Sequence, residues 1–276
     1  MNNKNSLLLV DPDFDPAYPA DRTLLLKLGS ESFSYAIVDS DTKQLRAVFD
    51  HQECQDTAAA FSSRLKTDGY LSIPFKEVKA SIFTENTISI PDELYDRETI
   101  NQYAKFFPLA QGNNLYTHSP EGFSFKSIFT LNEDIEEAIN SSLANCKVFD
   151  HQAPLLVLAR DSSQSALIFD FTSGSFNAAY LNEDKLIFQK YFEIENTEEF
   201  NYYLLYIINQ LKISTENTDV LIMGIIHKYD SNYKCIEKYF QSINFFEAPA
   251  IENDNKILDD MPAHYYSSLL ALNLCE

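Results

Sequence analysis

The sequence predicts an α/β fold made of two similar domains, each with a mixed sheet flanked by helices. Three observations support this prediction. Alternating apolar and polar residues indicate β-meanders over residues 24–49 and 166–192. A helical pattern follows each meander. Residues 220–226 form a continuous apolar run, which is typical of a strand buried on both faces of its sheet.

The first domain is expected over residues 23–151, after a polar arm over residues 1–22 that is rich in proline. The helix predicted at 55–67 stops at Asp68-Gly69. The helix predicted at 91–107 opens with Pro-Asp-Glu, and both proline and acids favour a helix N-terminus. A third helix is predicted at 132–143, and strands are predicted at 24–28, 32–38, 44–49, 76–83, 87–90, 123–131 and 146–150.

The second domain is expected over residues 152–276. Asn196 is a good N-cap residue, and Phe200, Leu204 and Ile207 are spaced to share one face of the helix that follows it. The predicted helices are 154–159, 196–211, 231–240 and 263–274, and the predicted strands are 166–171, 175–181, 185–192, 220–226 and 243–246.

The two meanders align with each other without a gap. Residues 24–41 lie on residues 167–184 at a constant offset, and the identical pairs are Ser30/Ser173, Ser32/Ser175, Phe33/Phe176, Ala36/Ala179 and Asp41/Asp184. Any two meanders share a period of two residues. The ungapped length and the common order of the following elements nevertheless favour a duplication, with two domains that face each other across a cleft.

The composition excludes several classes of function. The chain has 276 residues, 45% of them hydrophobic, and a net charge of −20 at pH 7. That charge would repel a nucleic-acid backbone or an anionic membrane, so we expect neither as the main partner. Only six residues are glycine. Because phosphate-binding turns need residues without a Cβ, this scarcity weighs against most nucleotide-binding motifs.

The sequence contains no targeting, membrane-spanning or metal-binding pattern. The apolar run at residues 7–10 is too short for a signal peptide, and no stretch reaches the roughly 18 apolar residues of a membrane span. The four cysteines are far apart, which favours free thiols in a reducing compartment. His51-x-x-Cys54 is half a metal site without a second half. We therefore expect a cytoplasmic protein with no membrane insertion and no metal.

With its duplicated meanders, the chain resembles the actin-like ATPase superfamily, whose fold is a duplicated ribonuclease-H-like domain. The resemblance extends from about Thr23 to Leu274. It implies that the final helix, 263–274, packs back on the first domain. The segments Phe83–Leu94 and His264–Tyr266 resemble more closely an uncharacterised bacterial domain-of-unknown-function family, family 3822.

The resemblance assigns a nucleotide to three turns. The first two strands of each meander flank a phosphate-binding turn in that superfamily, and a third turn binds adenosine after the buried strand of the second domain. If a nucleotide binds here, the residues implied are Lys27, Gly29, Ser30, Asp170, Ser173, Gly174 and Gly224.

The same turns depart from the superfamily pattern. Lys27 stands where an Asp organises Mg²⁺, Thr172 replaces a glycine, and Ile225 follows Gly224 where a second glycine is usual. The Glu that relatives place before Pro154 to orient water is absent. Phosphoryl transfer depends on positioning and on Mg²⁺ charge compensation, and these changes should weaken both. We therefore expect no catalytic residue and no resident cofactor; the alternative is ATP with Mg²⁺, because Lys27 could contact a phosphate directly.

These observations predict a non-catalytic scaffold or adaptor in the cytoplasm. Its expected partner is a protein, of basic character because the chain is acidic. The alternative is an ATP-binding protein, or a weak ATPase or kinase, that uses the interdomain cleft. An open cleft lined by glycine would favour the enzyme, and a cleft filled by side chains would favour the adaptor.

Overall fold

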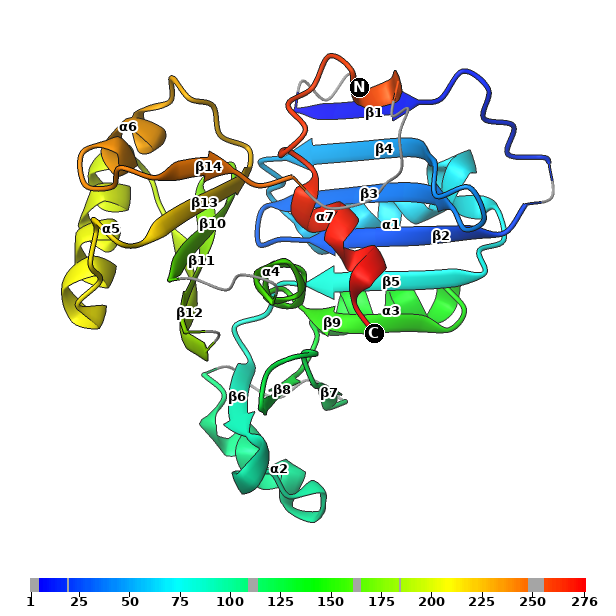
Figure 1. Ribbon diagram of the computed structural model, residues 1–276. Coiled ribbons are helices and arrows are strands. Elements are labelled where there is room, and N and C mark those ends of the chain that lie inside the picture. Colours follow the sequence, from blue (N-terminus) through cyan, green and yellow to red (C-terminus); the bar gives the residue numbers. More distant parts are fainter. Residues whose placement is uncertain (1–4, 19, 109–113, 161–164, 184, 248–255) are drawn as a thin grey trace.

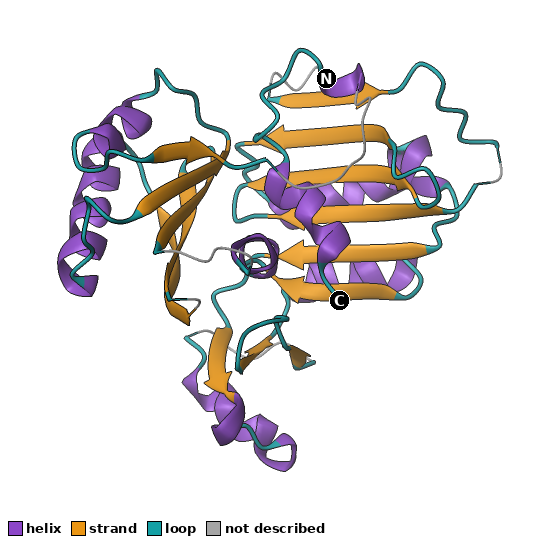
Figure 2. Cartoon of the chain, viewed as in Figure 1, coloured by secondary structure: helices purple, strands orange, loops and turns teal. Residues whose placement is uncertain are grey.

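Two mixed sheets form the body of the molecule, and a smaller antiparallel sheet lies beside them (Figure 1). The computed structural model describes residues 5–18, 20–108, 114–160, 165–183, 185–247 and 256–276. Helices lie against both large sheets (Figure 2), so the predicted α/β fold of two sheet-and-helix units is confirmed.

The first sheet has six strands in the order β1-β4-β3-β2-β5-β9. They are β1 (Ser6–Val10), β2 (Arg22–Leu28), β3 (Ser32–Asp39), β4 (Leu45–Gln52), β5 (Glu77–Ile82) and β9 (Cys146–Asp150). Leu24 and Leu26 pack in the core under α1 (Thr57–Thr67) and α3 (Glu133–Ser142). Leu25 points to the opposite core. Both faces of β2 are therefore buried, as the alternation of strand side chains requires.

The second sheet has five strands in the order β12-β11-β10-β13-β14. They are β10 (Ala166–Thr172), β11 (Ser175–Asn182), β12 (Lys185–Glu193), β13 (Asp219–Gly224) and β14 (Ile243–Phe245). An aromatic and aliphatic core that includes Phe169, Phe176 and Phe200 joins this sheet to α5 (Thr197–Leu211) and α6 (Ser231–Glu237). The apolar run at 220–226 supplies most of the interior strand β13, which pairs in parallel with β10 and β14.

The hairpins of the two sheets have the same register at the offset seen in the sequence. Leu28 pairs with Phe33 in the first hairpin, and Phe171 pairs with Phe176 in the second. The register shift against the third strand also recurs, between Ile37 and Val38 and between Tyr180 and Leu181. Because even this irregularity is repeated, we attribute the two meanders to duplication.

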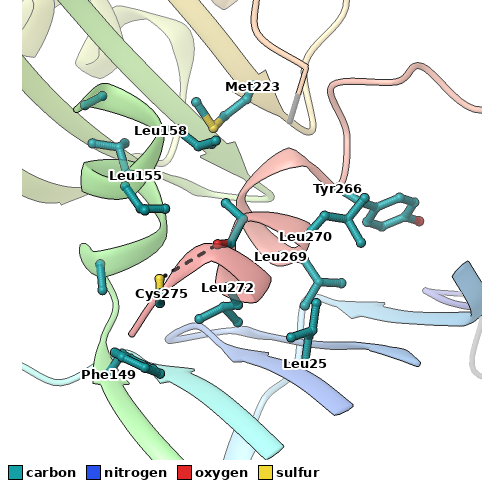
Figure 3. Packing of buried hydrophobic residues seen from close by; sticks show 14 of the residues in the cluster. Leu25, Phe149, Leu155, Leu158, Met223, Tyr266, Leu269, Leu270, Leu272 and Cys275 are labelled. Carbon is teal, nitrogen blue, oxygen red and sulfur yellow. Dashed lines mark hydrogen bonds between the residues drawn. The ribbon is translucent and has the colours of Figure 1, made fainter. Parts of the chain in front are cut away.

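One hydrophobic core is shared by the two large sheets. It contains residues of β2 and β3, residues of β10, β11 and β13, and two short helices, α4 (Ala153–Ala159) and α7 (Ser267–Ala271). Figure 3 shows Leu25 of the first sheet and Met223 of the second on either side of these helices, with Leu155, Leu269 and Leu270 nearby. The space between the sheets is therefore filled by apolar side chains.

The third sheet is inserted between β5 and α3. Its strands are β6 (Thr87–Pro91), β7 (Tyr116–His118) and β8 (Phe125–Phe129), in the order β6-β8-β7. The segment after β6 contains short 3₁₀ turns and one four-residue helix, α2 (Ile100–Tyr103). The prediction of one long helix at 91–107 is therefore wrong.

Two further expectations about the ends of the chain differ from the structure. The polar arm over residues 1–22 contains β1, an edge strand paired with β4. The helix expected at 263–274 is shorter, because α7 ends at Ala271 and a 3₁₀ turn, Leu272–Leu274, continues it. α7 crosses the face of the first sheet opposite α1 and α3 (Figure 1).

Candidate functional site

The three turns assigned to a nucleotide meet between the two large sheets, and a salt bridge joins two of them. Lys27 of β2 donates from Nζ to Asp170 Oδ2 of β10 at 2.6 Å and to Ser268 Oγ of α7 at 2.5 Å. The side chain of Asp170 is only 2% exposed and that of Lys27 is 13% exposed. The Lys27 ammonium group thus connects the first domain to the second domain and to the final helix.

Gly224, at the end of β13, is packed against β10. Its φ is +82°, and a Cβ added there would lie 2.1 Å from Phe171 O and 2.8 Å from Asp170 Oδ1. The backbone on both sides is also fixed, since Gly224 N donates to His264 O and Ile225 N donates to Phe171 O. Glycine is therefore required at position 224 because its backbone lies against the neighbouring strand β10.

The first turn is closed by contacts of its own. Gly29 N donates to Ser32 O at 2.7 Å, and a Cβ on Gly29 would lie 2.3 Å from Ser32 Oγ. The hydroxyl of Ser30 is hydrogen-bonded to that of Tyr191 on β12. The Ser30 carbonyl accepts from Thr57 Oγ1 at 2.8 Å. This turn therefore contacts the second domain directly.

The second turn contacts the first domain in return. Ser173 N donates to Gln52 Oε1 at 3.3 Å, and Ser173 Oγ donates to Glu53 Oε1 at 3.2 Å. Gly174 has a φ of +76° in the tight β10–β11 hairpin, and its carbonyl accepts from Ile194 N at 2.8 Å. The Ser173 amide, which the resemblance would direct at a phosphate, is thus paired with a side chain of the protein.

The cavity that remains between these turns has a volume of about 20 Å³ and is lined by Lys27, Asp50, Asp170 and Tyr266 among others. That is room for about one water molecule. Ligand pockets usually have volumes of about 300–1,000 Å³. The cleft is therefore closed in this structure, and side chains fill it.

The charges around this small cavity disfavour an anionic ligand. Lys27 faces two acids, Asp50 and Asp170. Burial raises the pKa of the Asp50 carboxyl, and Lys27 opposes that rise. Burial also raises the pKa of the neighbouring Tyr266. Because Lys27 is already paired, a triphosphate would meet no free cation among the described residues that line the cavity.

Of the residues predicted from the sequence, Lys27 and Asp170 line the closed cavity, and Gly224 packs against Asp170 beside it. Gly29, Ser30, Ser173 and Gly174 lie in the adjoining turns, within domain-to-domain or hairpin contacts. The sequence interpretation missed Ser268, Asp50 and Tyr191, which no motif marks. One signal in the sequence did point to the salt bridge. Lys27 and Asp170 occupy equivalent positions of the repeat and carry opposite charges.

Neither a metal centre nor a membrane-spanning helix is found in the described part of the chain. No group of three or more His, Cys, Asp and Glu residues there is arranged to hold a metal ion. None of the helices described is long and apolar enough to cross a bilayer.

The duplicated hairpins, the crossing final helix and the three converging turns define an actin-like fold, and comparison with solved structures confirms this class. A protein of unknown function with an actin-like ATPase fold from Bacteroides thetaiotaomicron has a TM-score of 0.76 at 17% identity, covering 95% of this chain and 99% of that one. The PilM–PilN type IV pilus biogenesis complex has a TM-score of 0.59 at 13% identity, covering 93% of this chain and 98% of that one. The ethanolamine utilization protein EutJ from Carboxydothermus hydrogenoformans has a TM-score of 0.52 at 9% identity, covering 97% of this chain and 93% of that one.

Within this class, the chain belongs to DUF3822, a family of proteins of unknown function, whose model matches residues 11–243. A comparison with curated proteins finds none with significant sequence similarity. At identities below 20%, the similar structures establish the fold and leave function to be argued from the site.

Proposed function

We propose that this protein is a non-catalytic, actin-like scaffold or adaptor that works in the cytoplasm and binds a protein partner. One observation carries the proposal. The Lys27–Asp170 salt bridge and Ser268 occupy the position to which the resemblance assigns a nucleotide, and the cavity beside them measures about 20 Å³. The protein supplies its own connection between the two domains at that position.

The residues of the closed cleft do not suit phosphoryl transfer. That reaction needs carboxylates free to hold Mg²⁺ and a nucleophile aligned with the phosphate. Here Asp170 Oδ2 accepts from Lys27, and Asp170 Oδ1 is buried beside Gly224 without a hydrogen-bond partner in the described structure. A metal ion at Asp170 would have to displace the lysine and leave its charge buried, which is costly.

Charge and a comparison favour a protein partner. The net charge of −20 attracts basic surfaces over long range and repels acidic ones. One of the similar structures, the type IV pilus protein, is a component of a protein complex. For our chain we infer the same general role, assembly with a basic protein.

Thermal melting with Mg·ATP tests the non-catalytic half of the proposal. We expect no shift of Tm at millimolar nucleotide. A ligand present at 100 times its Kd stabilises the folded state by about 2.7 kcal/mol, which would raise Tm of a chain this long by several degrees. A shift that disappears in Asp170→Ala would show that a nucleotide enters the cleft and would contradict the proposal.

Capture from a bacterial lysate tests the basic-partner half. Immobilised protein should retain a specific protein of high isoelectric point at low salt and release it as salt is raised, because screening shortens the range of the attraction. A partner that is acidic, or whose retention does not change with salt, would contradict a charge-driven interaction.

A further inference from the structure

A groove lies away from the closed cleft, between β12 and the small sheet. Its volume is about 1210 Å³, which exceeds the roughly 300–1,000 Å³ of sites for small molecules. One wall is β12 of the second domain, and the other is formed by β6 and β8. An occupant that fills this groove would contact both the second domain and the inserted sheet.

The edge of β12 opens into the groove. All seven residues from Lys185 to Tyr191 line it. Side chains alternate between the two faces of a strand, so a strand that showed only one face would contribute every second residue. β12 is also the outermost strand of its sheet among the described residues. Its outer backbone groups are therefore available to a further strand.

The facing wall offers a second edge. β6 is an outer strand of the small sheet, and Thr87, Ile88 and Ser89 line the groove consecutively. Gln189 Nε2 of β12 donates to Ser89 Oγ of β6 at 2.9 Å. This contact holds the two walls at a fixed separation, which favours an occupant that is thin and extended.

The side chains of the groove select an uncharged, apolar occupant. Its walls carry aromatic and aliphatic side chains, and Ile187 is 50% exposed there. The charged lining residues are two lysines, Lys185 and Lys190, and two acids, Glu85 and Asp150. They balance each other on a chain whose net charge is −20. A neutral segment complements this lining, whereas a basic one would complement the acidic remainder of the surface.

Two largely buried polar residues are among those that line the groove. His151 and Gln152 line the groove and are more than nine-tenths buried. Gln152 Nε2 lies 3.1 Å from His151 Nε2, and donation in that direction leaves the hydrogen on His151 Nδ1. Neither His151 Nδ1 nor Gln152 Oε1 has a hydrogen-bond partner in the described structure. Both atoms are enclosed by protein, and the His151 ring packs against Phe83 and Tyr191, so a peptide in the groove would reach them only by moving these side chains.

We propose that the partner protein inserts an extended, uncharged and apolar segment into this groove, where it adds a strand to the edge of β12. In such binding, main-chain hydrogen bonds supply affinity and alternate side chains supply specificity. A segment of five residues, the length of β6, spans about 17 Å. This inference rests on the proposed adaptor function and specifies where one uncharged segment of the partner is held. The salt-dependent attraction proposed above acts between the basic remainder of the partner and the acidic surface outside the groove.

Selection of peptides on the full chain tests this inference. Random peptides of about ten residues, displayed on phage, are selected on the immobilised protein, and enriched sequences are synthesised with a fluorescent label. We expect sequences of alternating apolar residues without net charge. Their Kd, from fluorescence anisotropy, should change less than about twofold between low and high salt, because screening acts on charged pairs. Bound peptide should slow hydrogen exchange at the β12 amides.

Two variants locate the binding. Ile187→Lys and Ser89→Lys each place a charge at an exposed position of the groove and should weaken the selected peptides at least about tenfold. Tyr202→Lys is the matched control, because Tyr202 is 65% exposed on α5 and does not line the groove. Melting curves establish that all three variants are folded.

Three outcomes would overturn the inference: no peptide is enriched, the enriched peptides are basic and lose affinity with salt, or they bind both groove variants as tightly as the unmodified chain. Each of these outcomes is separate from a failure of the adaptor proposal. That proposal fails when Mg·ATP raises Tm through Asp170, a measurement that does not involve the groove.

Discussion

At the scale of single residues, the decisive feature is a pair of opposite charges at equivalent positions of a duplicated hairpin. Lys27 pairs with Ser34 in β2–β3, and Asp170 pairs with Asn177 in β10–β11. The arrangement of the two halves places these positions opposite each other. A carboxylate at both would leave two like charges in contact unless a cation lay between them. A lysine on one side gives a bridge that needs no ligand.

Removing one partner of this bridge should destabilise the fold strongly. In Lys27→Met the Asp170 carboxyl remains almost fully buried without its cation. Breaking a buried pair in this way costs about 3–5 kcal/mol, measurable as a lower free energy of unfolding in urea. The matched control is Lys76→Met, which removes the exposed Lys76–Asp21 pair and should leave the free energy of unfolding nearly unchanged, because water and salt screen an exposed pair.

The double variant completes the test of the bridge. Lys27→Met with Asp170→Leu removes both charges, and replacing a buried ion pair by apolar residues is often neutral or stabilising. We expect it to recover most of the stability lost in the single variant. If the two single effects simply add, Lys27 and Asp170 are not coupled across the domains.

At the scale of elements, the sequence predicted most strands and helices but failed where local signals were misleading or absent. β9, at Cys146–Asp150, has the bounds that were predicted. The segment 91–107 was mistaken for one helix, because Pro-Asp-Glu resembles a helix N-terminus. In the structure Pro91 ends β6, and the residues that follow form separate turns stabilised locally, as by Tyr103 Oη donating to Leu94 O. β1 was missed because its partner β4 lies far along the chain.

The turn after β13 gives a prediction at this scale. Gly224→Ala should destabilise the protein by at least about 1–3 kcal/mol, because Ala is strained at a φ of +82° and its Cβ would collide with Phe171 O. Gly69→Ala is the control, since a Cβ on Gly69 meets nothing within 4 Å. That change should stabilise by about 0.4–1 kcal/mol through the unfolded state. Equal free energies of unfolding for the two variants in urea would contradict the packing role of Gly224.

At the scale of the whole molecule, the sequence predicted two similar units but could not show how tightly they are joined. Apolar periodicity indicates that one face of a helix or strand is buried, but it does not identify the element that packs against that face. The shared core depends on α4 and α7 packing against both large sheets. Ser268 reaches Lys27 only because α7 crosses between the sheets. Contacts between residues this distant in sequence leave no local pattern. The sequence therefore could not decide between an open cleft lined by glycine and a cleft filled by side chains.

The shared core predicts that the two domains unfold as one unit. Leu204 is fully buried in the core under α5, which contains residues of the second domain only. Leu204→Ala should cost about 2–5 kcal/mol. If unfolding is cooperative across both sheets, native-state hydrogen exchange will show the same loss of protection in β2 of the first domain as in β10 of the second. Leu94→Ala, at a position 65% exposed, should change neither. Loss of protection confined to β10 would mean that the domains open independently, as a cleft that admits a ligand requires, and would weigh against the closed adaptor proposed above.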